Sequence, residues 1–419
     1  MTAFPRILGI RQYFPPTASI DIRAALASEF AKLRPGLQPG ARIAVGVGSR
    51  GITQIRAIVA GVIAELQAAG THPFIIPAMG SHGGATPAGQ RAVLASYDIT
   101  ETSLGVPIED SLEVRVVGRT DDGWPVYGSV AALAADGILL VNRVKPHTDF
   151  LGTLGSGLLK MSVIGLGKHQ GAAAMHRLAA RVGHEAAIRS MAAVVVRTTP
   201  LIGGVAILEN ASHETARLIA IPRVEMATAE TALLETAREL LPRLPFDEID
   251  LLIVDRIGKN ISGAGLDPNV TGRWVDGYSS DLRRSGRPAP FIRRIFVRDL
   301  TPETHGNGIG IGLADVTTAR LVRALDLRAT SINALTALTP HTAKIPIHFE
   351  TDREAISRSL ESLAIDDVST ARVVRIADTL SLGDMAISEA LWATAQSQPS
   401  LTVTRPPAPM AFDAEGNLA

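Results

Sequence analysis

The sequence predicts an α/β protein of two domains, with mostly parallel sheets covered by helices and an active site in the cleft between the domains. Apolar runs of strand length alternate with amphipathic stretches of helix length, which is typical of parallel strands joined by helices. A hydrophobic share of 46% over 419 residues is enough for more than one core. Two prolines within residues 241–245 predict a linker. We therefore expect an N-terminal domain over 1–243, a C-terminal domain over 247–400 and an extended tail over 401–419.

The expected strands of the N-terminal domain are short apolar runs that lead into Gly-rich segments or turns, over residues 42–47, 72–78 and 136–142. The expected helices have apolar residues at helical spacing, over residues 53–69, from Pro87 onward and over 168–182. In the C-terminal domain we expect strands over 249–254, 292–297 and 372–376, and helices after Asp315 and after Thr351.

Composition excludes several classes of partner and site. The 41 basic and 41 acidic residues give a formal net charge of zero, which argues against nucleic acid or an anionic membrane as a partner. No signal peptide is visible and no apolar run reaches the roughly 18–20 residues of a membrane helix, so we expect a cytoplasmic protein. The absence of cysteine removes disulfides, thiolate metal sites and thiol nucleophiles.

The turn after the first strand, Gly46-Val47-Gly48-Ser49-Arg50-Gly51, fits the pattern G-x-G-x-x-G. Glycines there let backbone amides approach a phosphate near Gly48, and Ser49 and Arg50 would add donors. A dinucleotide fold also needs an acidic residue about 20 positions onward, and the strand over 72–78 contains none. The turn favours a simple phosphate over NAD, with a purely structural turn as the alternative.

His82 lies in the Gly-rich sequence Gly80-Ser81-His82-Gly83-Gly84, directly after the second expected strand. The carboxyl ends of parallel strands form the edge where ligands bind, and imidazole can accept a proton near neutral pH. The small neighbours favour close approach of a ligand, and a structural loop histidine is the alternative.

Residues 142–168 hold an unusual concentration of chemically active side chains. The chain has only six lysines against 35 arginines, and three of the six, including Lys160, fall in this segment. Only lysine offers a primary amine that can lose its charge. His147 lies in the same loop, and so long a loop in a compact domain is usually functional. His176 follows on the expected helix, where one histidine alone is weak evidence for a metal site.

The C-terminal domain contains a similar loop. Lys259 lies in a Gly-rich segment after the strand over 249–254 and could face the N-terminal domain across a cleft, with an exposed surface lysine as the alternative. The glycines between 306 and 312 lack a phosphate lysine, so we expect no P-loop there.

Together these segments resemble the lactate racemase family that depends on a nickel-pincer nucleotide, most strongly over residues 42–176. Ser156-Gly157-Leu158-Leu159-Lys160 matches the family's Ser-Gly-x-x-Lys motif. The resemblance implies that Lys160 is joined as a thioamide to the cofactor, pyridinium-3-thioamide-5-thiocarboxylic acid mononucleotide, beside Ser156 and Gly157. It also implies that His176, 16 residues after the lysine, completes the ligand sphere of the nickel.

The resemblance assigns roles to further residues. His82, in a Gly-x-His pattern, and His147, in a Pro-His pattern, would be alternating bases. Residues on the phosphate side of the cofactor would be Gly48, Ser49 and Arg50. Lys259 would be the lysine on the substrate side.

The activity that the resemblance implies is racemisation or epimerisation of a 2-hydroxy acid by reversible hydride transfer, which requires a cofactor because side chains cannot accept hydride. Two departures from the family argue against lactate itself: Val47 replaces the family's aspartate, and the stretch between His147 and Lys160 is longer. The expected partners are the small 2-hydroxy acid and the proteins that make the cofactor. The alternatives are a nicotinamide-type or metal-free oxidoreductase on the same scaffold, and a non-catalytic protein that binds a small ligand.

Overall fold

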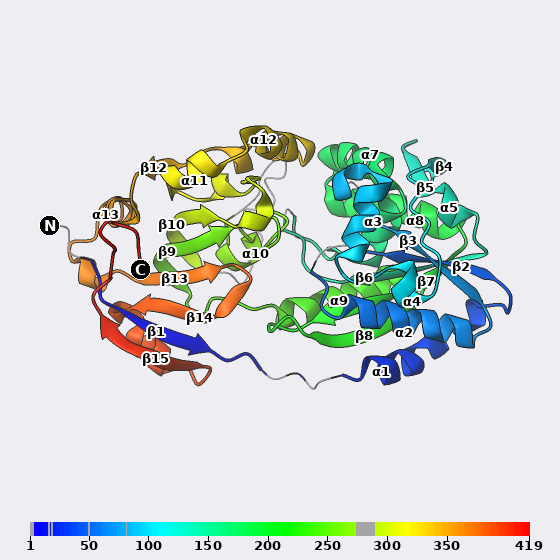
Figure 1. The fold of residues 1–419 in the computed structure, drawn as a ribbon, viewed down its shortest axis with the longest axis horizontal. Coiled ribbons are helices and arrows are strands. Elements are labelled where there is room, and N and C mark those ends of the chain that lie inside the picture. Colours follow the sequence, from blue (N-terminus) through cyan, green and yellow to red (C-terminus); the bar gives the residue numbers. More distant parts are fainter. Residues whose placement is uncertain are drawn as a thin grey trace. The chain divides into compact units, whose positions relative to one another are not determined.

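The computed structural model describes residues 4–15, 17, 20–48, 51–80, 82–148, 150–273 and 290–419. The chain divides into two compact units, which we describe one at a time (Figure 1). The N-terminal unit comprises Thr17–His147 and Leu151–Leu241, and the C-terminal unit comprises Met1–Pro16, Thr148–Phe150 and Pro242–Ala419.

The N-terminal unit is built on a five-stranded sheet in the order β3-β2-β6-β7-β8. Its strands are β2 (Arg42–Val47), β3 (His72–Pro77), β6 (Gly137–Arg143), β7 (Leu201–Glu209) and β8 (Thr215–Pro222). The pairs β3-β2, β2-β6 and β6-β7 are parallel, and β8 is antiparallel to β7. Nearly continuous burial along β2 and β6 is typical of a parallel sheet covered on both faces. The carboxyl ends of β2, β3 and β6 therefore lie at one edge of the sheet.

Helices accompany this sheet, and a separate hairpin is formed by β4 (Val114–Arg119) and β5 (Pro125–Ser129). The helices are α1 (Ile22–Glu29), α2 (Ile55–Ala68), α3 (Pro87–Ala95), α4 (Glu101–Leu104), α5 (Val130–Leu133), α6 (Leu158–Lys160), α7 (Lys168–Val182), α8 (His184–Thr198) and α9 (Met226–Leu240). Helix α3 begins where proline predicted it, because the Thr86 side chain accepts a hydrogen bond from the amide of Gly89 and proline needs no donor there.

The C-terminal unit contains an eight-stranded sheet in the order β12-β11-β10-β9-β13-β14-β1-β15. Its strands are β1 (Ile7–Gln12), β9 (Glu248–Ile257), β10 (Phe291–Leu300), β11 (Val316–Thr318), β12 (Ile347–Phe349), β13 (Val373–Asp378), β14 (Ser381–Ser388) and β15 (Leu401–Ala408). Pairing is parallel from β12 to β13 and antiparallel from β13 to β15. The helices are α10 (Pro268–Thr271), α11 (Ala319–Ala324), α12 (Leu327–Thr336), α13 (Asp352–Glu361) and α14 (Trp392–Gln396).

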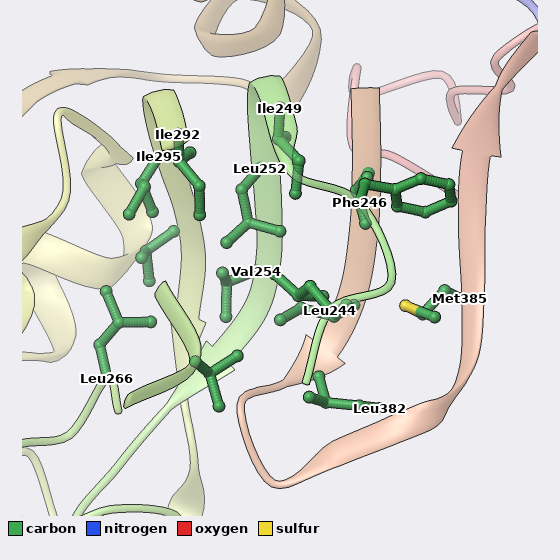
Figure 2. Packing of buried hydrophobic residues seen from close by; sticks show 14 of the residues in the cluster. Leu244, Phe246, Ile249, Leu252, Val254, Leu266, Ile292, Ile295, Leu382 and Met385 are labelled. Atoms are coloured by element: carbon green, nitrogen blue, oxygen red, sulfur yellow. The ribbon is translucent and has the colours of Figure 1, made fainter. Parts of the chain in front are cut away.

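Alternate residues of β9 pack into two separate cores, one on each face of this sheet. Leu252 and Val254 join the core drawn in Figure 2, which also includes Ile295. Leu251 and Ile253 point to the opposite face and pack with residues of α13 and β13. The apolar run over 249–254 is continuous because both faces of the strand are buried. The predicted α/β class with mostly parallel, helix-covered sheets is thereby confirmed.

The compact units differ from the expected ranges 1–243, 247–400 and 401–419. Residues 7–12 form β1 in the sheet of the C-terminal unit, between β14 and β15, and residues 401–408 of the expected tail form β15. Strand β1 is held there by hydrogen bonds to partners more than 370 positions away, which no local pattern can indicate. Within the described ranges, no helix combines the length and apolar character needed to cross a membrane.

Candidate active site

Three imidazoles and one amine lie together beyond the carboxyl end of β6. Nζ of Lys160 lies 2.5 Å from Nε2 of His147. The ring of His184 is stacked with that of His147, with 6.0 Å between centroids, and meets the ring of His176 edge-on at 5.9 Å. We call His147, Lys160, His176 and His184 the imidazole cluster. Its members come from the loop after β6 and from α6, α7 and α8.

Two residues near the end of β6 form hydrogen bonds with the Ser-Gly-x-x-Lys motif. Ser156 forms two backbone hydrogen bonds with Lys145, of 2.9 and 2.8 Å. Nδ2 of Asn142, near the end of β6, donates to the carbonyl of Gly157 at 3.0 Å. A Cβ atom at Gly48 would lie 2.5 Å from Oδ1 of the same asparagine, so the glycine turn and the lysine motif meet at Asn142. Close packing against Asn142 is therefore enough to explain why residue 48 is glycine, without a bound phosphate.

Lys160 and His176 lie on one nearly continuous helical segment. Helix α6 leads into a π-helical turn, Met161–Gly165, and then into α7. π-Helical turns are rare in proteins, and those that occur often lie at functional sites. Lys168, at the start of α7, is buried and donates to the carbonyl of Pro77 at 2.6 Å, which ties the end of β3 to this segment. Burial lowers the pKa of Lys168 to about 8.

Burial and the charge of Lys160 keep the three imidazoles neutral at pH 7. Burial, followed by Lys160, lowers the pKa of His176 to about 4. Burial, then His176 and Lys160, lowers the pKa of His184 to about 3. The pKa of His147 lies well below its ordinary value for the same reasons, with burial first and Lys160 second. Neutral imidazole is the form that accepts a proton or binds a metal.

The ring of His176 has a nitrogen available for a ligand. Its Nδ1 is buried and has no hydrogen-bond partner in the described part of the chain. Across the described residues, no group of three or more His, Asp or Glu side chains is arranged to hold a metal ion by itself. A metal at His176 would therefore need further ligands from a bound group, and a nickel cofactor that brings its own carbon and sulfur donors fits this requirement.

His82 lies at the same sheet edge, in the loop after β3. Strands β3 and β6 are both neighbours of β2, so the loops carrying His82 and His147 start about 10 Å apart. Gly80 in this loop has a positive φ of 61°, and a Cβ there would lie 2.8 Å from the side chain of Ile164 in the π-helical turn. The expected phosphate ligands Ser49 and Arg50 lie outside the described residues.

Lys259 belongs to the C-terminal unit, in the loop after β9. Its amide donates to Oγ1 of Thr304 at 3.2 Å, and its Nζ donates to the carbonyl of Gly263 at 3.4 Å. The structure thus gives the local setting of this lysine, and its role toward a substrate stays a prediction.

Two residues of the site were missed by sequence reasoning. His184 follows His176 by eight positions, a spacing compatible with one helix face, but Gly183 separates the two helices. Glu230 is fully buried in α9, and its Oε2 accepts a hydrogen bond from the amide of Leu159, inside the lysine motif, at 3.0 Å. No local signal links Glu230 to a motif 70 positions earlier in the chain.

Part of the chain is similar in sequence to a known family. Residues 15–188 match the family model of the lactate racemase N-terminal domain. The matched region includes every member of the imidazole cluster, and the match confirms the resemblance that the motifs predicted.

The fold of the whole chain is similar to a solved structure. The lactate racemase apoprotein from Thermoanaerobacterium thermosaccharolyticum superposes with a TM-score of 0.53 and 14% sequence identity, over 90% of this chain and 99% of that one. At this level of identity the likeness is one of fold. No curated protein sequence matches the chain.

Proposed function

We propose that this chain is a racemase or epimerase of a 2-hydroxy acid that uses a nickel-pincer nucleotide attached to Lys160. The observation that carries the proposal is the contact of 2.5 Å between Lys160 and His147, in the region that matches the lactate racemase N-terminal domain, with His176 on the same helical segment. An amine, a neutral base and an open imidazole nitrogen are among the groups that this chemistry requires from the protein.

The residues that would hold the cofactor are separate from those that would act on the substrate. Lys160 would be the covalent attachment, His176 the protein ligand to nickel, and Ser49 and Arg50 the phosphate ligands near Gly48. When bound, the cofactor supplies reversible acceptance of a hydride, which no side chain can provide.

The protein's own contribution to the reaction is proton transfer and orientation. Neutral His147 would take the hydroxyl proton of one enantiomer. Loss of this proton and of a hydride from the carbinol carbon leaves a planar keto acid, to which hydride can return on either face. His82, from the loop two strands away, would serve the other enantiomer. Lys259 would hold the substrate carboxylate by a charge-assisted hydrogen bond.

The experiment that tests the proposal is mass spectrometry of the protein produced in a host that makes the cofactor. The peptide containing Lys160 should carry a mononucleotide-sized adduct, and the intact protein should carry nickel. Lys160→Arg, which keeps the charge and approximate length, should lose the adduct, whereas the matched change Lys32→Arg at an exposed lysine should keep it. An unmodified Lys160 peptide in the parent protein would contradict the proposal and favour a metal-free oxidoreductase or a binding protein.

A further inference from the structure

A buried carboxylate lies against the turn that carries Lys160. Glu230 of α9 is 0% exposed, and its Oε2 accepts from the amide of Leu159 at 3.0 Å. The amide of Leu158 also donates to this carboxylate. Both donors belong to the first turn of α6, whose last residue is Lys160. Amides at the start of a helix have no partner within it, so Glu230 satisfies two groups that would otherwise be left unpaired.

The same carboxylate explains the glycine of the lysine motif. A Cβ atom at Gly157 would lie 2.4 Å from Oε1 of Glu230 and 2.8 Å from Oε2, closer than nonbonded atoms approach. The φ of Gly157 is 179°, which any residue can adopt, so its backbone conformation does not require glycine. The requirement comes from the space that Glu230 occupies. Gly157 is also held by Asn142, whose side-chain amide donates to the carbonyl of Gly157.

Maintaining a carboxylate at this position is costly. Oε1 of Glu230 is buried without a hydrogen-bond partner among the described residues. Burial raises the pKa of Glu230 to about 7, against the lowering effect of the two amides. Residues that reduce stability are typically retained where function requires them.

We propose that Glu230 is a positioning residue that fixes Lys160 at the imidazole cluster by anchoring the first turn of α6. The proposal concerns the placement of the amine in the protein itself, and its use in catalysis rests on the function proposed above. A lysine that bears a covalently attached reacting group has to be held within a fraction of an ångström, because small displacements of reacting atoms strongly reduce rates.

Competitive acetylation of the full-length apoprotein, produced in a host without the cofactor pathway, tests the proposal. Acetic anhydride would label Lys160 and exposed Lys32 in one sample over a range of pH, with Lys32 as the internal reference. Leaving buried amides without an acceptor is unfavourable enough to shift the population of the anchored turn about tenfold. Glu230→Leu should therefore raise Lys160 labelling relative to Lys32 by about this factor. Glu230→Gln keeps an acceptor of the same shape and should stay within about twofold of the parent.

Two further variants complete the test. Glu235→Gln changes an exposed glutamate on the same helix and should leave Lys160 labelling unchanged. Gly157→Ala would displace the carboxylate while keeping it in the chain, and should raise the labelling of Lys160 even if Glu230→Leu does not fold. Parental labelling in Gly157→Ala or in folded Glu230→Leu would overturn the proposal, as would equal increases in the Gln and Leu variants.

Cofactor-loaded protein separates this inference from the proposed function. In a host that makes the cofactor, the adduct on Lys160 should be retained in Glu230→Gln and reduced about tenfold in Glu230→Leu, in parallel with the labelling. If the parent carries no adduct, the proposed function fails, while the labelling result still decides whether Glu230 positions Lys160.

Discussion

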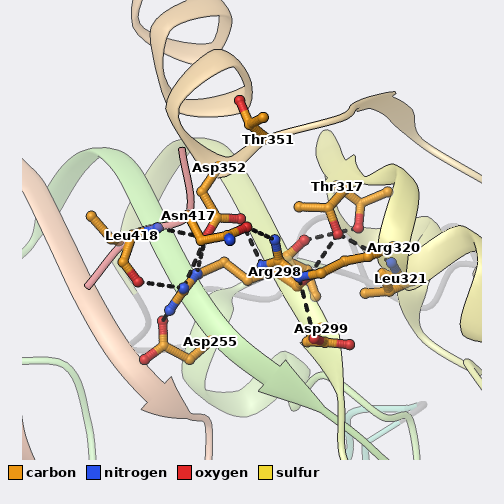
Figure 3. Close-up of polar contacts among 12 residues, drawn as sticks. Asp255, Arg298, Asp299, Thr317, Arg320, Leu321, Thr351, Asp352, Asn417 and Leu418 are labelled. Carbon is orange, nitrogen blue, oxygen red and sulfur yellow. Dashed lines mark hydrogen bonds and ion pairs between the residues drawn. The ribbon is translucent and has the colours of Figure 1, made fainter. Parts of the chain in front are cut away.

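Two groups of buried polar side chains, one in each unit, differ in how completely they are paired. In the C-terminal unit, Asp352 is fully buried and accepts hydrogen bonds from Arg298 at 2.8 Å and from Arg320 at 2.7 Å (Figure 3). Arg298 also donates to Asp255 at 2.7 Å and to the carbonyl of Leu418. Each charge in this network has an opposite charge and additional hydrogen bonds, as buried ions require.

The imidazole cluster of the N-terminal unit contains one buried nitrogen without such compensation. The three rings of the cluster are neutral because burial and Lys160 lower their pKa values, and Nδ1 of His176 has no hydrogen-bond partner among the described residues. Buried polar groups without partners reduce stability, so they persist where an interaction outside the folded chain uses them. The comparison teaches that a fully paired network of buried charges indicates architecture, whereas an unpaired nitrogen beside a partly buried amine and two further imidazoles indicates a site for a ligand.

The largest expected effect is on activity, in the N-terminal unit. His147→Ala and His82→Ala should each reduce racemisation about 100- to 10,000-fold, the usual loss when a general base is removed. With pure enantiomers, stopped-flow absorbance of the loaded enzyme should show that each variant retains cofactor reduction from only one enantiomer, and that the two variants retain opposite ones.

The substrate for this measurement is chosen first by screening 2-hydroxy acids on the parent enzyme. His169→Ala, at an exposed position on α7, is the control and should retain both half-reactions. If both variants retain reduction from the same enantiomer, His82 and His147 do not act on opposite faces of the substrate.

Breaking the charge network of the C-terminal unit should affect stability instead. Asp352→Ala leaves Arg298 and Arg320 without their shared buried acceptor, which should cost about 3–5 kcal/mol in the free energy of unfolding. Urea dependence of hydrogen exchange in peptides from β9 and β10 measures this loss in the affected unit. A change below about 1 kcal/mol would mean that the network behaves like surface ion pairs.

Glu230 should make stability depend on pH in a direction set by its raised pKa. The folded protein holds a proton up to about pH 7 that the unfolded chain releases near its ordinary value of 4.5. The stability contributed by protonation is therefore present below pH 4.5 and is lost as pH rises through about 7. Glutamine does not titrate, so Glu230→Gln should gain about 2–3 kcal/mol relative to the parent between about pH 5 and pH 8.

Urea unfolding of parent and variant at several pH values measures this difference. Glu235→Gln is the matched control because it makes the same change at a side chain of the same helix that is 60% exposed. A Glu230→Gln difference that is independent of pH would show that Glu230 ionises in the folded protein as it does in the unfolded chain.

The smallest expected effect is at an exposed ion pair of the C-terminal unit. Nε of Arg11 lies 2.8 Å from Oδ1 of Asp384, with both side chains more than half exposed. Asp384→Ala should change the free energy of unfolding by less than about 1 kcal/mol, because water and salt screen such pairs. A loss comparable to that of Asp352→Ala would remove the distinction between buried and surface pairs on which the comparison depends.

Local sequence patterns were sufficient for the six strands that we expected and for the order of the motifs. The strand over 42–47 has the predicted bounds, and Pro87 begins α3, because an apolar run and a proline at the first helical turn act within a few residues. The sequence placed Lys160 in a Gly-rich loop and His176 on a helix, whereas the structure joins them in one nearly continuous helical segment. The structure brings Lys160 to His147, which the sequence placed in the same loop.

Only the tertiary structure decided which distant residues complete these elements. Strand β1 enters the sheet of the C-terminal unit through pairing with β14 and β15, and His184 joins the imidazole cluster from a separate helix. Glu230 shows the physical reason most clearly, since in the sequence it is one of three glutamates in the same helix. Its role depends on burial and on two amides of a distant turn, and these contacts exist only after the chain has folded.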